Sequence, residues 1–167
     1  QLLRDVILPP LQNPVLAPLD DGALVEAPEP RLALTTDAYV VDPLFFPGGD
    51  IGRLAVCGTV NDLAMQAAAP RYLTLSLIVE EGLPIPQLRR AVASIAHTAD
   101  EAGVIVATGD TKVVPRGKGG GLFITTAGLG VRSSAADGRV SSAQPGDAIL
   151  LSGTIGDHGI AVLCCRE

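Results

Sequence analysis

Aromatic side chains make up only 3% of this 167-residue sequence, and Trp is absent. The core must therefore be built from Leu, Val, Ile and Ala. The composition is nevertheless 47% hydrophobic and 18% charged, which is typical of a folded globular protein. The length suffices for one domain with a sizeable core, or for one domain and the beginning of another.

Positive charge is also in short supply, because 12 Lys and Arg residues stand against 18 Asp and Glu residues. The resulting net charge of −6 argues against nucleic acid or an anionic membrane as the main partner. No apolar run reaches the roughly 18 residues of a membrane span. An acidic protein can still bind phosphates where a metal ion or a local Lys neutralises their charge.

Cysteine is rare, with Cys57 in a predicted helix and the adjacent Cys164 and Cys165 close to the end of the sequence. The adjacent pair lacks the spacing of zinc ligands. An odd total, with no secretion signal at the start, indicates a reducing cytoplasm. Cys57 falls on an apolar helix face, which predicts a small core residue.

Helical and strand patterns alternate along the chain. They predict helices from about 50 and over 86–102, and strands over 23–25, 32–36, 71–80, 104–107, 122–131 and 148–151. Two such helices can cover one face of a mixed sheet, in a ferredoxin-like α+β layer. The other face needs a cover, which a second copy would provide in a two-fold dimer. We assign 1–151 to this domain and 152–167 to the start of a second one.

Acidic residues recur where the predicted elements end. Asp37 follows the strand over 32–36, and Asp62 lies beside Asn61 on the next helix. Short carboxylates on rigid elements suit Mg²⁺, which is often held by one or two of them together with substrate phosphates. Taken singly, such acids more often cap a turn or face water, so the functional interpretation depends on their recurrence.

A further strand, over 104–107, runs into the segment Thr108–Lys112, which contains Asp110. Lys can place a point charge on a phosphate, and Asp can hold the bridging metal, so this recurrence favours a metal–phosphate site. The glycine-rich segment Arg116–Gly121 lacks the spacing of a phosphate-binding loop, and we interpret it as a mobile connector or lid. The pair Asp20 and Asp21 fits an ordinary turn equally well.

Four segments resemble the HypE family closely: TTDAYVVDPLFFPGGDIGRLAVCGTVNDLAM from Thr35, EEGLP from Glu80, TGDTKVV from Thr108 and SGTIGDHG from Ser152. HypE proteins are carbamoyl dehydratases in the ATP-binding superfamily of aminoimidazole ribonucleotide synthetase, selenophosphate synthetase and thiamine-monophosphate kinase. The resemblance covers nearly the whole chain from about residue 20. It implies an N-terminal α+β domain that dimerises through its sheet, with ATP and Mg²⁺ bound near the dimer interface.

The resemblance also implies roles for individual side chains. The acids would bind Mg²⁺, with Asp110 alternatively orienting the phosphates. Asn61 would be a neighbouring polar ligand, and Lys112 would lie near the polyphosphate, so that Lys112 and Asp110 take the catalytic roles. The implied metal ligands are Asp20, Asp21, Asp37, Asp62 and Asp110, and the implied ATP-binding residues are Asp37, Asn61, Asp62, Asp110 and Lys112.

The implied reaction starts from a carbamoyl group on a cysteine at the enzyme's own C-terminus, delivered by a HypF-type carbamoyltransferase. ATP phosphorylates the amide oxygen, and loss of phosphate and a proton leaves a thiocyanate. A HypC–HypD-type complex receives this group for the cyanide ligands of [NiFe] hydrogenase. Phosphoryl transfer needs positioning and charge neutralisation more than a protein nucleophile, which acids with Mg²⁺ and one Lys can supply.

Three parts of the family pattern are missing: its glycine-rich segment near the N-terminus, its second domain and its C-terminal cysteine tail. Cys164 and Cys165, at the expected start of a helix, are not that tail. We therefore expect this chain alone to be inactive, to bind nucleotide weakly and to dimerise. Two alternatives are another superfamily enzyme, such as selenophosphate synthetase or a small-molecule kinase, and a non-catalytic dimerisation or docking module.

Overall fold

The computed structural model describes residues 2–14, 17, 32–132 and 143–166. The predicted strand over 23–25 and the acids Asp20 and Asp21 lie outside these residues. Among the described residues, no helix is both long and apolar enough to cross a membrane.

Four strands form the main sheet: β1 (Leu32–Tyr39), β4 (Ala68–Glu80), β5 (Ile105–Val114) and β6 (Leu122–Arg132). Their order is β1-β6-β4-β5. The outermost pair β4–β5 is parallel, and the other two pairs are antiparallel, so the sheet is mixed. Strands β1 and β5 are the two edges of this sheet, and they carry Asp37 and Asp110 respectively.

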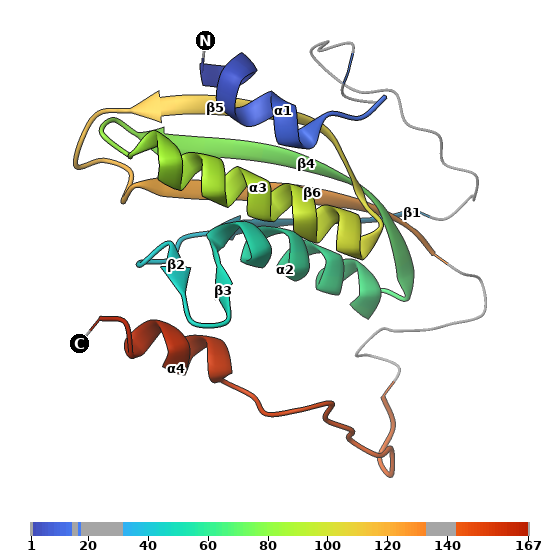
Figure 1. Cartoon of the computed structure of the whole chain (residues 1–167). Helices are drawn as coiled ribbons and strands as arrows, with labels where there is room; N and C mark the ends of the chain where they lie inside the picture. Colours follow the sequence, from blue (N-terminus) through green and yellow to red (C-terminus); the bar gives the residue numbers. More distant parts are fainter. Residues whose placement is uncertain (1, 15–16, 18–31, 133–142, 167) are drawn as a thin grey trace.

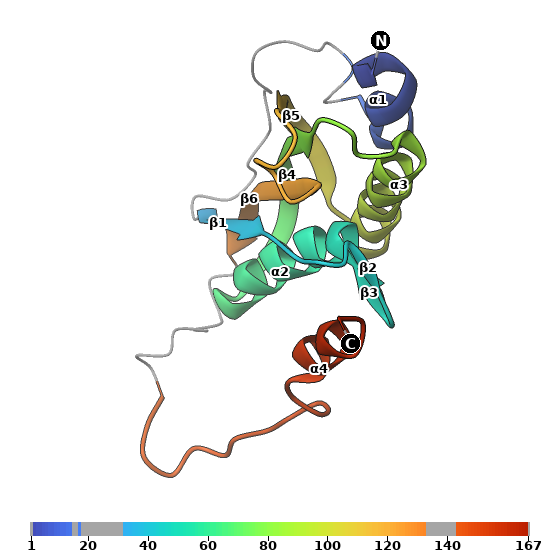
Figure 2. The ribbon, with the colours of Figure 1, turned by 90° about the vertical axis from the view of Figure 1, so that its left-hand side faces the viewer.

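Two long helices, α2 (Ile51–Met65) and α3 (Ile85–Ala102), lie on the same face of the sheet (Figures 1 and 2). The short N-terminal helices η1 (Leu3–Ile7) and α1 (Leu8–Leu11) join them beside β5. No helix that the structure describes covers the opposite face, called here the open face. The predicted class, an α+β mixed sheet with its helices on one face, is confirmed.

Local capping interactions place both helices. The Asp50 carboxylate caps α2 by accepting hydrogen bonds from the backbone N–H groups of Gly52 (2.8 Å) and Arg53 (3.0 Å). Its other oxygen accepts one from the Ser94 hydroxyl on α3 at 2.8 Å, which fixes the two helices together. Helix α3 ends at Gly103, whose φ of +66° favours glycine.

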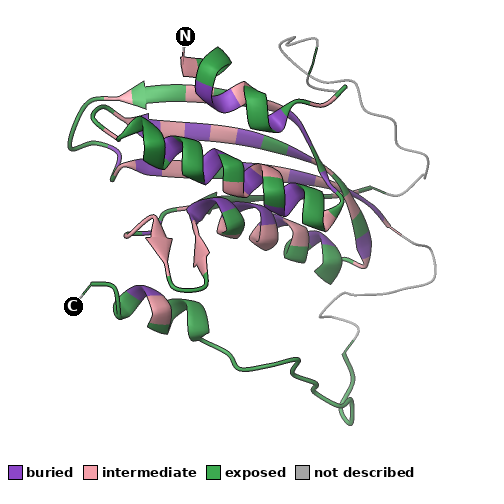
Figure 3. Ribbon diagram, in the orientation of Figure 1, coloured by how far each residue is buried: buried purple, intermediate pink, exposed green. Residues whose placement is uncertain are grey.

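The core lies between the helices and the sheet. Alternate β4 residues from Leu73 to Val79 are buried against the helices, and Figure 3 shows this banding. The core contains aliphatic side chains in place of the missing large aromatics, as expected. The largest fully buried ones include Ile51, Leu63, Leu73, Leu77, Leu88, Ile95, Leu122 and Ile124.

The C-terminal part packs on a small hairpin rather than on the sheet. Strands β2 (Phe45–Phe46) and β3 (Gly49–Asp50) form this hairpin, and α4 (Asp157–Leu163) lies beside it. The rings of Phe46 and His158 are 5.2 Å apart between centroids. Helix α4 ends at Leu163, so Cys164 follows a helix. This corrects the expectation that Cys164 and Cys165 lie at the start of one. The proposed division at residue 152 stays a prediction.

Two further expectations about strands were wrong. Strands β1 and β5 continue well past their predicted ends, so Asp37 and Asp110 lie inside strands and not after them. The extension of β5 follows from its pairing with β4, in which Asp110 is opposite Ser76. Residues 148–151 form no strand, and Ile149 and Leu150 are 93% and 90% exposed. Within the part of the chain that the structure describes, no strand pairs with them.

Candidate functional site

Asp37 points toward the helical side of the sheet. In the antiparallel register it is opposite Thr126, whose side chain is buried beneath α2. Side chains that alternate along a strand share a face, so Thr35, Asp37 and Tyr39 form one row on this side of β1. Because β1 is an edge strand, Asp37 is still exposed to solvent.

Asp62 lies beside this row. It is in the last turn of α2, and its Oδ2 accepts a hydrogen bond of 2.9 Å from the Thr35 hydroxyl. Thr35 and Asp37 are about 6.6 Å apart along the strand and share a face, so Asp37 and Asp62 lie at the same edge of the sheet. Asn61 and Asp62 are both exposed. We call Asp37 and Asp62 the acid pair.

A chain of hydroxyl groups lies directly behind the acid pair. The Tyr39 hydroxyl is 3.0 Å from Thr59 Oγ1, which is 2.5 Å from Thr126 Oγ1. The Thr126 hydroxyl reaches the backbone carbonyl of Ala55 at 3.3 Å. Burial raises the pKa of Tyr39, and the nearby Asp37 carboxylate raises it further, by its charge and as a hydrogen-bond acceptor.

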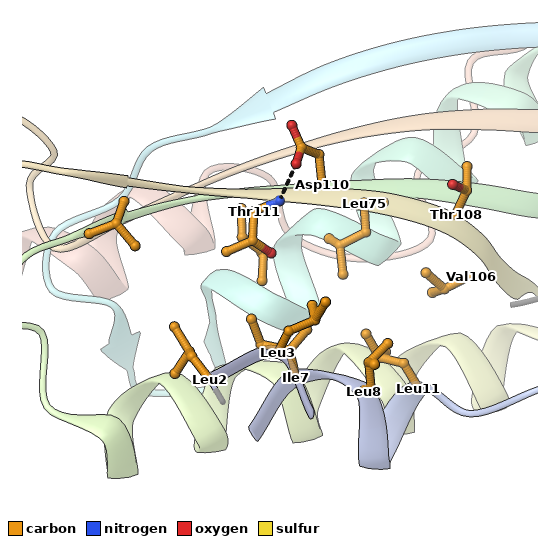
Figure 4. Close-up of a pocket in the computed structure, with 13 residues that line it drawn as sticks. Leu2, Leu3, Ile7, Leu8, Leu11, Leu75, Val106, Thr108, Asp110 and Thr111 are labelled. Carbon is orange, nitrogen blue, oxygen red and sulfur yellow. Dashed lines mark hydrogen bonds between the residues drawn. The ribbon is translucent and has the colours of Figure 1, made fainter. Parts of the chain in front are cut away.

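Asp110 and Lys112 lie at the other edge of the sheet. Lys112 Nζ is 2.9 Å and 3.1 Å from the two carboxylate oxygens of Asp110. This contact, followed by the Thr111 backbone N–H, lowers the pKa of Asp110. Asp110 shares its face with Ser76, so it lies on the open face, and Figure 4 shows its carboxylate pointing away from Leu75.

A single chain therefore does not gather the predicted acids into one cluster. Three strand spacings, about 14 Å, separate the strands of Asp37 and Asp110, and the two side chains leave opposite faces. Among the described residues, no group of three or more His, Cys, Asp or Glu side chains is arranged to hold a metal ion. The acid pair can supply two oxygen ligands, which is the number Mg²⁺ often takes from a protein before water and phosphates complete its shell.

The glycine-rich segment Arg116–Gly121 is tied to the end of β4. The Glu80 carboxylate accepts hydrogen bonds from the backbone N–H groups of Gly117 and Gly121, the latter at 2.7 Å. The Gly117 bond is the main cause that lowers the pKa of Glu80. These donors already hold an anion from the same chain, so the segment is not a ready phosphate cradle. Glu80 was not among the predicted site residues, although its position as an acid at the end of a predicted strand was an available signal.

Two sizeable cavities lie away from the acid pair. One, of about 420 Å³, separates the N-terminal helices from β4 and β5 and has mostly apolar walls such as Leu3 and Ile7 (Figure 4). The other, of about 330 Å³, lies between the β2–β3 hairpin, α2 and α4. Cys57 is half-buried in its wall instead of sitting in the core, which corrects that expectation. Neither Asp37 nor Asp62 lines either cavity.

Residues 19–132 match the sequence family described as "AIR synthase related protein, N-terminal domain". The carbamoyl dehydratase HypE of Rhizobium leguminosarum bv. viciae is 50% identical over 167 residues, which are 100% of this chain and 48% of that protein. The chain spans about half the length of the curated relatives it matches.

Solved structures of HypE are similar to this chain in both sequence and fold. A crystal structure of the hydrogenase maturation protein HypE in complex with ATP is 52% identical, with a TM-score of 0.95. The match covers 99% of this chain and 49% of that one. A HypE–HypF complex matches 92% of this chain and 50% of its own, at 50% identity and a TM-score of 0.80.

Proposed function

The chain belongs to the family of AIR synthase related proteins, with the resemblance to HypE confirmed, and from this premise we propose that it forms the ATP- and Mg²⁺-binding part of an ATP-dependent carbamoyl dehydratase. The single observation that carries this proposal is the acid pair. Two exposed carboxylates from different elements lie at one edge of the sheet: Asp62 on α2 accepts a hydrogen bond from Thr35, and Asp37 is two residues from Thr35 on the same face of β1.

Mg²⁺ would be held by Asp37 and Asp62, with Asn61 as a neighbouring polar ligand and the nucleotide phosphates completing its shell. The ion would neutralise the phosphate charge that repels an acidic protein. Asp62 keeps one oxygen for the metal while the other accepts from the Thr35 hydroxyl. Asp20 and Asp21 are further candidate ligands outside the described residues.

A second copy of the chain would complete the site. The open face carries the 76% exposed Leu34, and both edge strands can pair further. A two-fold axis along the strands sets β1 of one copy opposite β5 of the other. In that dimer, Asp110 and Lys112 of the second copy approach the edge that holds the acid pair. Lys112 would then place its charge on the polyphosphate, and Asp110 would hold metal or orient phosphate.

The reaction served by this site would convert an S-carbamoyl cysteine to a thiocyanate. The γ-phosphoryl group passes from ATP to the amide oxygen, which releases ADP. The C–O bond then breaks and phosphate leaves, while the nitrogen gives up both of its protons, one to the phosphate and one to solvent, as the C≡N bond forms. We propose that this occurs in the cytoplasm, with a HypF-type carbamoyltransferase as donor and a HypC–HypD-type complex as acceptor. One solved relative is a HypE–HypF complex, which supports that donor.

Calorimetry of Mg·ATP binding tests the proposal on the wild-type chain and on Asp37→Asn and Asp62→Asn. The matched control is Asp100→Asn, which alters an exposed acid on α3. We expect Mg²⁺-dependent binding that both site variants weaken at least tenfold and that the control preserves. Equal affinity in all four proteins would overturn the site. A stable dimer that binds no nucleotide would instead support the docking-module alternative.

A further inference from the structure

Each carboxylate of the acid pair has one oxygen engaged by a donor of this chain. The Thr35 hydroxyl donates to Oδ2 of Asp62 at 2.9 Å, and the Ala38 backbone N–H donates to Oδ1 of Asp37 at 2.8 Å. Both acids are exposed, so these contacts add little to the stability of the core. Their effect is on the carboxylates themselves, because each hydrogen bond commits one of the two oxygens that a cation could use.

The contact between Thr35 and Asp62 depends on how closely α2 approaches the sheet. Thr35 is half-buried on the helical side of β1, and its partner in the neighbouring strand β6 is Gly128. A Cβ atom at Gly128 would lie 2.7 Å from Thr59 Cγ2 and 3.0 Å from Leu63 Cδ1, both on α2. A glycine at this position therefore lets the last turn of α2 come down on the sheet, and Asp62 is brought within hydrogen-bond distance of Thr35.

The two common divalent cations use a carboxylate differently. Ca²⁺ takes six to eight oxygen ligands in a flexible shell and often binds both oxygens of one carboxylate. Mg²⁺ demands an octahedral shell of shorter bonds, keeps several waters, and takes little more than one oxygen from each of one or two carboxylates. A cation that binds both oxygens of Asp62 must compete with the Thr35 hydroxyl for Oδ2, whereas a cation that binds Oδ1 alone leaves that hydrogen bond intact.

We propose that Thr35 determines the metal preference of the site: by holding Oδ2 of Asp62 it leaves Oδ1 as the ligand, which favours Mg²⁺ over Ca²⁺. Thr35 is a positioning residue, because it acts through Asp62 and does not touch the cation. This inference rests on the proposed function, in which Asp62 is a ligand of the nucleotide-bound metal. The Ala38 N–H constrains Asp37 in the same way, but a backbone donor offers no matched substitution, so the test uses Thr35.

The test compares the calorimetric affinities of Mg·ATP and Ca·ATP for the wild type, Thr35→Val and Thr35→Ser. Val keeps the shape of Thr and removes the hydroxyl, and Ser restores it. We expect Thr35→Val to strengthen Ca·ATP binding and weaken Mg·ATP binding, so that the preference for Mg²⁺ falls about tenfold, the order of one hydrogen bond to a charged acceptor. Thr35→Ser should keep the wild-type preference.

Two further variants control this comparison. Thr36→Val is the matched control, because Thr36 is the next residue of β1, points to the open face and donates its hydroxyl to the Thr126 carbonyl at 3.0 Å. It should leave the preference unchanged. In an Asp62→Asn background, Thr35→Val should also leave the preference unchanged, because the carboxylate through which Thr35 acts is gone.

The outcomes separate this inference from the proposed function. If Thr35→Val changes both affinities by the same factor, or gains no affinity for Ca·ATP, Thr35 does not select the metal, and the Mg·ATP site stands. A preference lost equally in Thr35→Ser would show that the methyl group and not the hydroxyl matters, which also overturns the inference. If the wild type and Asp62→Asn bind Mg·ATP equally, the proposed function fails and the role of Thr35 fails with it.

Discussion

The Thr35 hydroxyl donates a hydrogen bond of 2.9 Å to Asp62 across 27 residues of sequence, and this contact joins the strand and the helix that carry the acid pair. Its effect is to fix the Asp62 side chain, which is otherwise free at the exposed end of α2. A carboxylate held in one rotamer loses less entropy when it binds a metal ion.

Asp62→Ala should weaken Mg·ATP binding at least tenfold while leaving the fold almost unchanged. An exposed acid contributes little to folding, so we expect a change in unfolding free energy of less than about 0.5 kcal/mol. Calorimetry and urea denaturation of the same preparation measure the two effects. Parallel losses of affinity and stability would show that Asp62 supports the structure instead of the ligand.

Gly58→Ala should destabilise the chain although Ala favours helices. The propensity gain is at most about 1 kcal/mol. The new Cβ, 2.3 Å from the Tyr39 hydroxyl, forces a displacement that costs about 1–3 kcal/mol. Urea denaturation should show a net loss. Adding Tyr39→Phe should recover only part of it, because Tyr39 Cε1 and Cζ are also within 3.0 Å of the new atom. A stabilised Gly58→Ala would contradict the close approach.

Local chemistry made much of this fold predictable. Asp50 marks the start of α2 and Gly103 the end of α3, and each acts through its own neighbouring backbone. The alternating apolar residues of β4 likewise predict which of its faces is buried. These signals depend on residues close together in sequence, so they can be read without the structure.

The position of the acids was not predictable in the same way. Asp37 and Asp110 both come shortly after an apolar run of residues and look equivalent in sequence. Their separation depends on the strand order, which puts β1 and β5 at opposite edges, and on the register, which turns the two side chains to opposite faces. The pairing of Tyr39 with Thr59 and Thr126 also spans distant segments, so no local pattern announces it.

Glu80→Gln should remove a pH-dependent part of the stability. The folded-state pKa of Glu80 is lowered, so its contribution is present above its unfolded-state pKa of about 4.3 and is lost as the pH falls through the lower folded value. Urea midpoints measured from pH 6 down to pH 3 should therefore fall less steeply for Glu80→Gln than for the wild type. Identical slopes would mean that Glu80 does not hold the glycine-rich segment in solution.

Mixing two inactive variants should restore binding if the site is shared between two copies. In an Asp37→Asn dimer, each site lacks Asp37, and in an Asp110→Asn dimer each lacks Asp110. A mixed dimer has one site with both losses and one with neither. Random exchange makes about half of the dimers mixed, so about a quarter of the sites should regain wild-type affinity for Mg·ATP.

The control for this mixing experiment adds Leu34→Lys, which places a charge on the open face, to one variant. If the open face forms the dimer, light scattering should show that this protein is monomeric, and mixing should then restore nothing. Recovery that persists with Leu34→Lys would place the shared interface elsewhere. No recovery in a mixture of stable, exchanging dimers would show that Asp110 acts apart from Asp37, and the acid pair would then have to bind magnesium and phosphate with groups from its own copy alone.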